Sequence, residues 1–358
     1  MASQLALLFA QRLEVPVVLT DLDTDRLDKG VSHVHGEIDA LLLRGRISPD
    51  TATRLKTLVT GSLTKDAFAD ADLVIEAVFE DLKIKKQVLA EVEAVVAPEA
   101  LLLTNTSSLS VAAMAADLAH PERVAGLHFF NPVAVLPLVE VVRAAGTDDA
   151  SVATTLAVAK KLRKNAVLVA DAPAFVVNRL LTRFMGEVLA GVESGTPIAV
   201  ADEALAPLGL PMSPLVLLSL VGPAIALHVA ETLHGEFGDR FRDPAGLARM
   251  VAAGRTSVYE ADGTVDKEVA ALIQVGSGSA ALTGEQVREN ALEALAQEIR
   301  LLLDEQVVAA AQDVDLCMIL GAGWPFHLGG ITPFLDRTGV SERVTGGRFT
   351  PRGVATLP

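Results

Sequence analysis

The sequence predicts a mostly parallel α/β domain followed by a helical region. Over residues 1–171, apolar runs alternate with helical stretches, which is the pattern of βαβ units. Beyond residue 171 the strand pattern stops and long apolar helices begin. A Gly/Ser-rich stretch at residues 276–281 divides these helices and is typical of a linker. We therefore predict three domains, 1–171, 172–275 and 276–358.

The elements of the first domain follow from apolar periodicity and from turn residues. A helix at residues 5–13 precedes a buried strand at 15–21, and a long helical stretch at 26–58 is interrupted near Gly45 and at Ser48-Pro49-Asp50. The remaining elements are strands at 73–78, 101–104, 124–129, 138–142 and 167–170, and helices at 83–96 and 110–118.

The helical region contains two similar segments. The turn Gly209-x-Pro211 matches Gly323-x-Pro325 at an offset of 323 − 209 = 114. A duplicated helical domain explains this match, and coincidence between two helix-turn-proline segments is the alternative. Residues 215–230 are interpreted as one buried core helix, because the run is too short for a membrane span and contains Pro223.

Composition excludes several classes of protein. The 45 acidic residues outnumber the 30 Lys and Arg, giving a net charge of −15, which argues against nucleic acids as partners. The single cysteine, Cys317, excludes an internal disulfide and favours a reducing compartment, so we expect a cytoplasmic protein with no membrane span. No metal is expected, since His33 and His35 diverge on a helix.

The start of the chain departs from a complete dinucleotide-binding domain. Such a domain opens with a strand, a glycine-rich turn and a helix, and an acidic residue ends its second strand. Here Asp21 ends the strand after the first helix, but the first strand and its glycines are missing. We expect a Rossmann-like domain truncated at its start. The alternative is a fold that binds no dinucleotide.

Polar residues at predicted strand ends form the candidate site. Parallel α/β sheets place ligands at such ends. His128 ends one strand and Glu140 begins the next, and a carboxylate beside an imidazole makes a general base. Ser107 can bond a substrate oxygen, and Asn178 can reach across a domain cleft. The alternatives are a structural histidine and a polar helix end.

Four motifs occur in a fixed order: NTSS at 105–108, GLHFFNP at 126–132, PLVEVV at 137–142 and AFVVNRLL at 174–181. Their spacings are 128 − 107 = 21, 140 − 128 = 12 and 178 − 128 = 50. In these motifs the chain resembles the 3-hydroxyacyl-CoA dehydrogenases. The tandem helical domains and GWPFHLGG at 323–330 resemble the dehydrogenase part of the bacterial fatty-acid oxidation complex alpha subunit, without its hydratase domain.

This resemblance implies NAD-dependent oxidation of L-3-hydroxyacyl-CoA to 3-oxoacyl-CoA in fatty-acid β-oxidation. His128 would accept the hydroxyl proton, Glu140 would orient His128, and Ser107 and Asn178 would hold the substrate oxygen. Asp21 would bind the adenosine ribose and repel the 2′-phosphate of NADP. The implied partners are the acyl-CoA substrate and a thiolase beta subunit. The implied NAD contacts are Met1, Asp21, Val78, Phe79, Glu80, Lys85, Asn105, Ser107 and Asn131.

Two other functions remain open. A different β-hydroxyacid dehydrogenase would have the same Rossmann-plus-helical plan, but we would expect a lysine base where this chain has His128 and Glu140. An inactive truncated fragment, or a docking module of a fatty-acid oxidation complex, would need none of the catalytic residues.

Overall fold

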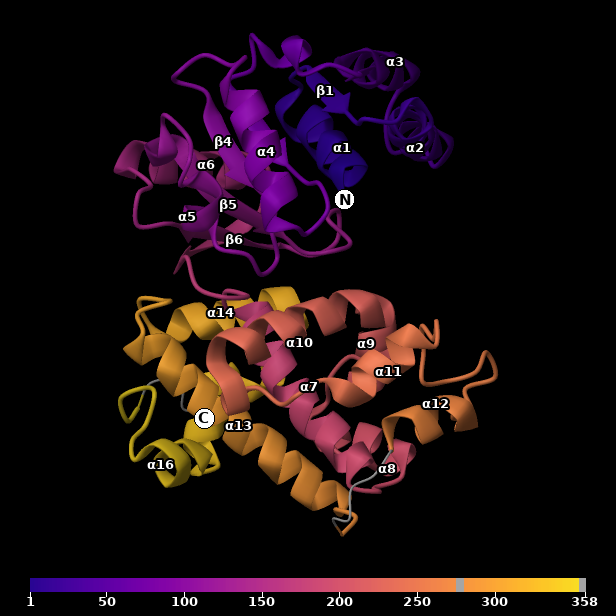
Figure 1. Ribbon diagram of the computed structural model, residues 1–358, viewed down its shortest axis with the longest axis vertical. Coiled ribbons are helices and arrows are strands. Elements are labelled where there is room, and N and C mark those ends of the chain that lie inside the picture. The colour runs from indigo at the N-terminus through magenta and orange to yellow at the C-terminus, as the bar shows by residue number, and fades with distance from the viewer. Residues whose placement is uncertain (275–279, 354–358) are drawn as a thin grey trace. The chain divides into compact units, whose positions relative to one another are not determined.

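The computed structural model describes residues 1–274 and 280–353 and divides into two compact units, Met1–Asp171 and Ala172–Pro358 (Figure 1). The first unit is α/β and the second is helical, as predicted, and the first unit ends at residue 171. Residues 172–274 and 280–353 pack within one unit. The predicted linker lies largely outside the described residues, so the division at residue 275 stays a prediction.

The strands of the first unit form two separate sheets. One has the order β1-β2 and the other the order β3-β4-β5-β6-β7. All pairs are parallel except β5–β6, which is antiparallel. In the described chain no strand pairs with both β1 and β3. The strands are β1 (Val17–Thr20), β2 (Val59–Ser62), β3 (Leu73–Glu76), β4 (Leu101–Thr104), β5 (Val124–Phe129), β6 (Leu138–Arg143) and β7 (Asn165–Ala170).

The predicted elements of this unit are present with small shifts, and the strand at 59–62 and the helix at 149–161 were not among them. The four residues of β2 carry a polar sequence, VTGS, without the alternation that predicts a strand. Pairing with β1 alone places them in a sheet. The helices are α1 (Ala2–Leu13), α2 (Thr24–Leu43), α3 (Pro49–Leu58), α4 (Leu82–Glu93), α5 (Val111–Ala115) and α6 (Asp149–Lys161), with short 3-10 turns η1 (Lys65–Phe68) and η2 (Pro121–Arg123).

Helix α1 connects the cores beneath the two sheets. Leu5 and Phe9 pack with the apolar side chains of β3, β4 and β5, whereas Ala6 and Ala10 pack with α2 and α3. Both clusters include Val17 of β1 as a partly buried member. Burial on two faces of one helix therefore joins the β1-β2 sheet to the larger sheet without strand pairing.

The second unit is built on the antiparallel contact of two long helices, α7 and α13. Its helices are α7 (Val177–Glu193), α8 (Ile198–Glu203), α9 (Pro214–Val221), α10 (Pro223–Phe237), α11 (Ala245–Ala252), α12 (Lys267–Ile273), α13 (Gly284–Asp304), α14 (Ala311–Ala322), α15 (Ile331–Arg337) and α16 (Val340–Thr345). Short 3-10 turns are η3 (Ala206–Leu208), η4 (Gly238–Arg240) and η5 (Phe326–Leu328).

The two glycine-proline turns occupy equivalent places in this unit. Gly209 and Gly323 both end a helical turn with positive φ, at 73° and 72°. A Cβ built on Gly323 would lie 3.0 Å from Pro211, so the two turns contact each other. In each segment a buried aspartate, Asp202 or Asp315, accepts a hydrogen bond from the backbone at the start of the next helix. The duplication of a helical domain stays a prediction.

The prediction of one buried helix at residues 215–230 was wrong. The chain forms α9 and α10, which meet at Gly222 with a bend of 100°. Gly222 has φ 96°, which ends α9 before Pro223 begins the next helix. Leu220 and Ile225 are mostly exposed. Among the described residues no single helix is long and apolar enough to span a membrane, although α9 and α10 together pass that test.

Candidate functional site

The carboxyl ends of β1 and β3 lie close together although these strands belong to different sheets. The guanidinium of Arg26, in the first turn of α2 after β1, lies 5.8 Å from the ring centre of Phe79, which follows β3. Asp21 follows β1 directly, and its carboxylate accepts the N–H of Asp23 at 3.1 Å. Candidate site residues therefore gather at one edge, as ligand sites do in such sheets.

His128 and Glu140 face each other across the antiparallel pair β5–β6. They are direct register partners, and His128 Nδ1 lies 2.6 Å from Glu140 Oε2. Both side chains are buried. The ring of Phe130 lies 4.5 Å from the imidazole, centre to centre. Residues that are direct partners on neighbouring antiparallel strands have their side chains side by side on one face of the sheet. The register of β5 and β6 therefore places Glu140 next to His128.

The loop after β4 is held by the carboxylate of Glu80. Oε1 of Glu80 accepts hydrogen bonds from Thr106 Oγ1 at 2.5 Å, from the N–H of Ser107 at 2.8 Å and from the N–H of Ser108 at 3.1 Å. These bonds fix the backbone that carries the Ser107 side chain. One carboxylate thus sets the position of a predicted substrate contact.

Lys85 joins this loop to the end of β3. Its ammonium donates to both oxygens of Glu76 at 2.9 Å and lies 3.1 Å from Glu80 Oε2. Glu76 also accepts a bond from Thr104 Oγ1 at 2.6 Å. Although burial alone would raise it, the charge of Lys85 and the bonds from Thr106 and Ser107 hold the pKa of Glu80 below its ordinary value.

The two asparagines of the predicted site anchor backbone and side chains. Asn105 Oδ1 accepts the N–H of Phe129 at 2.9 Å, which ties the ends of β4 and β5 together. Asn131 Oδ1 accepts a bond from Gln4 Nε2 at 3.0 Å, and Gln4 Oε1 accepts the N–H of Val133 at 2.9 Å. Helix α1 is thereby fixed to the loop that follows β5.

The residues around these ends suit a dinucleotide. Phe79 is 68 % exposed and Val78 is 41 % exposed beyond β3, which leaves apolar surface for a flat ring. Asp21 supplies a carboxylate for hydroxyl groups. Met1 is half exposed at the N-terminus of α1, where helix amides favour an anionic phosphate. The site of NAD expected from the sequence is thus chemically consistent, although its residue contacts stay predictions.

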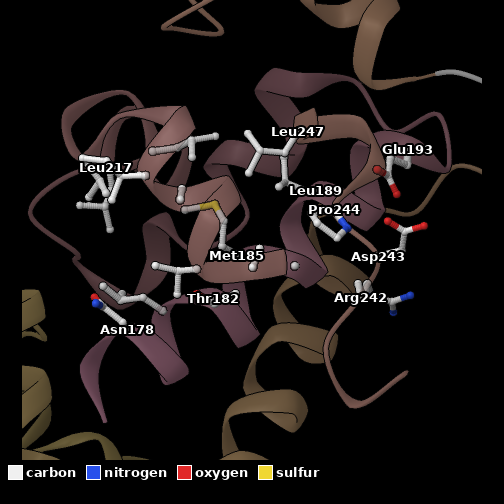
Figure 2. Close-up of a pocket in the computed structure, with 18 residues that line it drawn as sticks. Asn178, Thr182, Met185, Leu189, Glu193, Leu217, Arg242, Asp243, Pro244 and Leu247 are labelled. Carbon is white, nitrogen blue, oxygen red and sulfur yellow. The ribbon is translucent and has the colours of Figure 1, made fainter. Parts of the chain in front are cut away.

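Asn178 belongs to the other unit. It lies in the first turn of α7 and lines a cavity of the helical unit (Figure 2). Within the first unit, Glu80 contacts Lys85 and the N–H of Ser107, and His128 contacts Glu140. Asn105 binds the backbone of Phe129, next to His128, and Asn131 binds Gln4. The sequence analysis missed Gln4, Glu76 and Thr106. Glu76 carried a signal, because an acid ends the otherwise apolar strand LVIE.

Replacing Glu80 with glutamine should destabilise the first unit by roughly 1–3 kcal/mol at pH 7, because a buried acceptor of charge-assisted bonds is lost. The pKa of Glu80 is lowered in the folded state, so its contribution is present above the ordinary glutamate pKa of about 4.3 and is lost as the pH falls through the folded value. Urea unfolding of both proteins at several pH values measures this difference.

The exposed Glu99→Gln variant is the control, and we expect it to match the wild-type protein at every pH. A stability difference for Glu80→Gln that stayed constant from pH 7 to pH 3.5 would contradict this account of Glu80.

The comparisons with known proteins agree with this geometry. Residues 1–172 match the model of the 3-hydroxyacyl-CoA dehydrogenase NAD-binding domain, and residues 175–267 match the model of the C-terminal domain of the same enzymes.

Solved structures give the same result. The chain is similar to 3-hydroxybutyryl-CoA dehydrogenase from Escherichia coli, with 25% identity, a TM-score of 0.78 and coverage of 99% of this chain and 95% of that one. It is also similar to (S)-3-hydroxybutyryl-CoA dehydrogenase from Ralstonia eutropha, with 31% identity, a TM-score of 0.66 and coverage of 72% and 95%. The dehydrogenase part of a multifunctional enzyme from C. elegans shares the fold, with 22% identity, a TM-score of 0.57 and coverage of 99% and 84%.

Proposed function

Because the chain belongs to the 3-hydroxyacyl-CoA dehydrogenase family, we propose that it oxidises L-3-hydroxyacyl-CoA to 3-oxoacyl-CoA in fatty-acid β-oxidation, with His128 and Glu140 as its general-base pair. The observation that carries this proposal is the 2.6 Å contact between His128 Nδ1 and Glu140 Oε2. The reaction removes a hydride from C3 and a proton from the 3-hydroxyl. NAD, when bound, supplies the acceptor for the hydride.

In this proposal, the contact between Glu140 and Nδ1 leaves Nε2 of His128 as the nitrogen that acts as the base. A carboxylate accepts hydrogen bonds, so in this proposal Nδ1 carries a proton and donates a hydrogen bond to Glu140. Nε2 is then the unprotonated nitrogen that takes the proton of the 3-hydroxyl. As the imidazole gains positive charge, the buried carboxylate stabilises it, and this stabilisation is strong where water is excluded.

Ser107 and Asn178 would hold the substrate oxygen as it becomes a carbonyl. The proposal for Ser107 is supported by its fixed backbone, since Glu80 accepts the Ser107 N–H at 2.8 Å. Asp21 would bind the ribose hydroxyls of NAD, and Val78 and Phe79 would pack against its rings. Met1, Glu80, Lys85, Asn105 and Asn131 complete the proposed cofactor surroundings, with Lys85 acting through Glu80 because its ammonium is buried.

The proposal also includes a location in the cell and a protein partner. The sole cysteine, Cys317, is buried, and a chain with one cysteine fits the cytoplasm. A thiolase subunit would consume the 3-oxoacyl-CoA product and is the proposed protein partner.

The reaction is tested by following NADH at 340 nm with NAD and L-3-hydroxybutyryl-CoA. We expect NADH to accumulate with the L enantiomer and not with the D enantiomer, because the base and the two oxygen contacts hold C3 in one orientation. Protein that is folded by circular dichroism yet forms no NADH from hydroxyacyl-CoA of any chain length would refute the proposal.

A further inference from the structure

Gln4 joins the first turn of α1 to the loop that follows β5. It is half-buried within the first unit. Its Oε1 accepts the N–H of Val133 at 2.9 Å, and its Nε2 donates to Asn131 Oδ1 at 3.0 Å. These bonds link residues that lie 129 and 127 positions apart in the sequence. The proposed function gives Gln4 no role, although Asn131 is one of its proposed NAD contacts.

The backbone of Val133 settles how both side-chain amides are turned. A backbone N–H can only donate, so the atom of Gln4 that faces Val133 is its oxygen. The amide nitrogen of Gln4 therefore faces Asn131, and the oxygen of Asn131 is the atom that can accept from it. The amide nitrogen of Asn131 lies on the other side of that planar group and faces away from Gln4. Since Asn131 is exposed, this N–H2 group can donate to a ligand.

A second anchor holds the same loop independently of Gln4. The ammonium of Lys164 donates to the carbonyl oxygen of Val133 and, at 2.6 Å, to that of Leu136. Val133 is also fully buried. A protein without the Gln4 side chain would therefore keep this loop attached, and what it would lose is the constraint on the amide of Asn131.

Asn131 lies close to the proposed base. It follows His128 by three residues, so the two Cα atoms are at most about 11 Å apart. In the proposed reaction the hydride leaves a carbon whose hydroxyl faces His128, so the nicotinamide that receives the hydride is needed near this end of β5. Gln4 itself lies in the first turn of α1, whose amides favour the diphosphate of the same cofactor. Its bond to Asn131 thus connects two proposed parts of the NAD site.

We propose that Gln4 is a positioning residue for NAD, because it turns the amide of Asn131 so that the N–H2 group donates to the carboxamide oxygen of the nicotinamide. This inference rests on the proposed function, which needs the nicotinamide near His128. An Asn131 amide turned the other way would present an oxygen to that carboxamide oxygen, and two acceptors form no hydrogen bond. Gln4 holds the productive orientation before the cofactor arrives, which reduces the cost of ordering on binding.

Replacing Gln4 with methionine removes both bonds and changes little else. Methionine is close to glutamine in length and in helix propensity. Gln87→Met is the matched control, because Gln87 is an exposed glutamine on α4 of the same unit whose Nε2 donates to Glu91 at 2.8 Å.

Isothermal titration calorimetry with NADH and with ADP-ribose measures the effect. The two ligands carry the same diphosphate charge, and ADP-ribose lacks the nicotinamide. We expect Gln4→Met to raise the Kd for NADH roughly three- to tenfold, since one hydrogen bond is lost, and to leave the Kd for ADP-ribose within about twofold. Gln87→Met should keep both wild-type values. Equal weakening of the two ligands, or no weakening for NADH, would overturn the positioning role.

The Asn131→Ala background shows whether Gln4 acts through Asn131. In that background the amide that Gln4 orients is absent, so adding Gln4→Met should change the Kd for NADH by less than about twofold. A loss of the same size in both backgrounds would mean that Gln4 affects the fold in general, which contradicts the proposal.

Gln4→Glu is a second variant that keeps the bond to the loop. Its carboxylate still accepts the N–H of Val133 but cannot donate, so Asn131 turns its N–H2 group toward the carboxylate and its oxygen toward the nicotinamide. We expect the ratio of the Kd for NADH to the Kd for ADP-ribose to rise roughly threefold or more. An unchanged ratio would show that Gln4 only anchors the loop, and would overturn the proposal.

The same titrations separate this inference from the proposed function. A wild-type protein that binds neither NADH nor ADP-ribose would overturn the proposed function and the role of Gln4 with it. A wild-type protein that binds NADH, with Gln4 variants that bind it equally well, would overturn the role of Gln4 alone.

Discussion

Replacing His128 with glutamine should lower kcat by about a thousandfold while leaving the KM for NAD within twofold of the wild-type value. Glutamine is close to histidine in size but cannot accept and release the proton at neutral pH, and loss of a general base costs roughly 10²–10⁴ in rate. NADH formation from L-3-hydroxybutyryl-CoA measures the change.

His120 offers a matched control for this variant. It is also a histidine whose Nδ1 contacts a glutamate, Glu122 Oε1 at 3.1 Å, but both side chains are exposed. We expect His120→Gln to retain wild-type kcat. A His128→Gln protein that kept more than a tenth of the wild-type kcat would show that another group removes the proton.

Replacing Arg179 with methionine should lower the stability of the helical unit by about 3 kcal/mol, which corresponds to a fall in Tm of roughly 6–12 °C. Arg179 is fully buried on α7, and its Nε and Nη2 each bind a carboxylate oxygen at 2.5 Å. The first oxygen belongs to Glu298 of α13 and the second to Glu305, the residue that follows α13. Removing it leaves the buried carboxylate of Glu298 with Arg240 as its remaining cationic partner among the described residues. Thermal unfolding followed by circular dichroism at 222 nm measures the loss.

Arg343→Met is the control for Arg179, because Arg343 also binds a glutamate of α13. Its partner is Glu293 at 3.0 Å, and both side chains are about half exposed. Exposed pairs contribute roughly 0–1 kcal/mol, so this variant should unfold near the wild-type temperature. Equal Tm values for the two variants would mean that the Arg179 network does not stabilise the contact between α7 and α13.

The role of Arg179 shows which contacts could not be predicted from the sequence. In the sequence, Arg179 is one residue of the motif AFVVNRLL. Its role depends on two glutamates that lie 119 and 126 residues further along the chain. Glu80 and Lys85 were predicted as cofactor contacts from resemblance. Glu80 bonds to Thr106 and Ser107 because β3 and β4 are neighbours in the sheet. Lys85 bonds to Glu76 of β3, and these contacts could not be predicted from the sequence.

Strand β2 and the bend between α9 and α10 were not predicted from the sequence, for opposite reasons. Strand β2 has too few apolar residues to be recognised and exists through its pairing with β1. The segment at 215–230 has so many apolar residues that periodicity merges two helices, and the bend at Gly222 depends on a backbone angle that composition does not report.

Local patterns in the sequence predicted the α/β and helical regions and the strand ends that carry His128 and Glu140, and the order of the motifs indicated the family. These features repeat within a few residues or stand in fixed order along the chain, so local periodicity and motif spacing report them. Tertiary structure alone decided the direct pairing of His128 with Glu140, the clamp that Glu80 forms on the Ser107 loop, and the cavity behind Asn178. Each of these requires segments distant in sequence to pack together, and that closeness is a property of the folded chain.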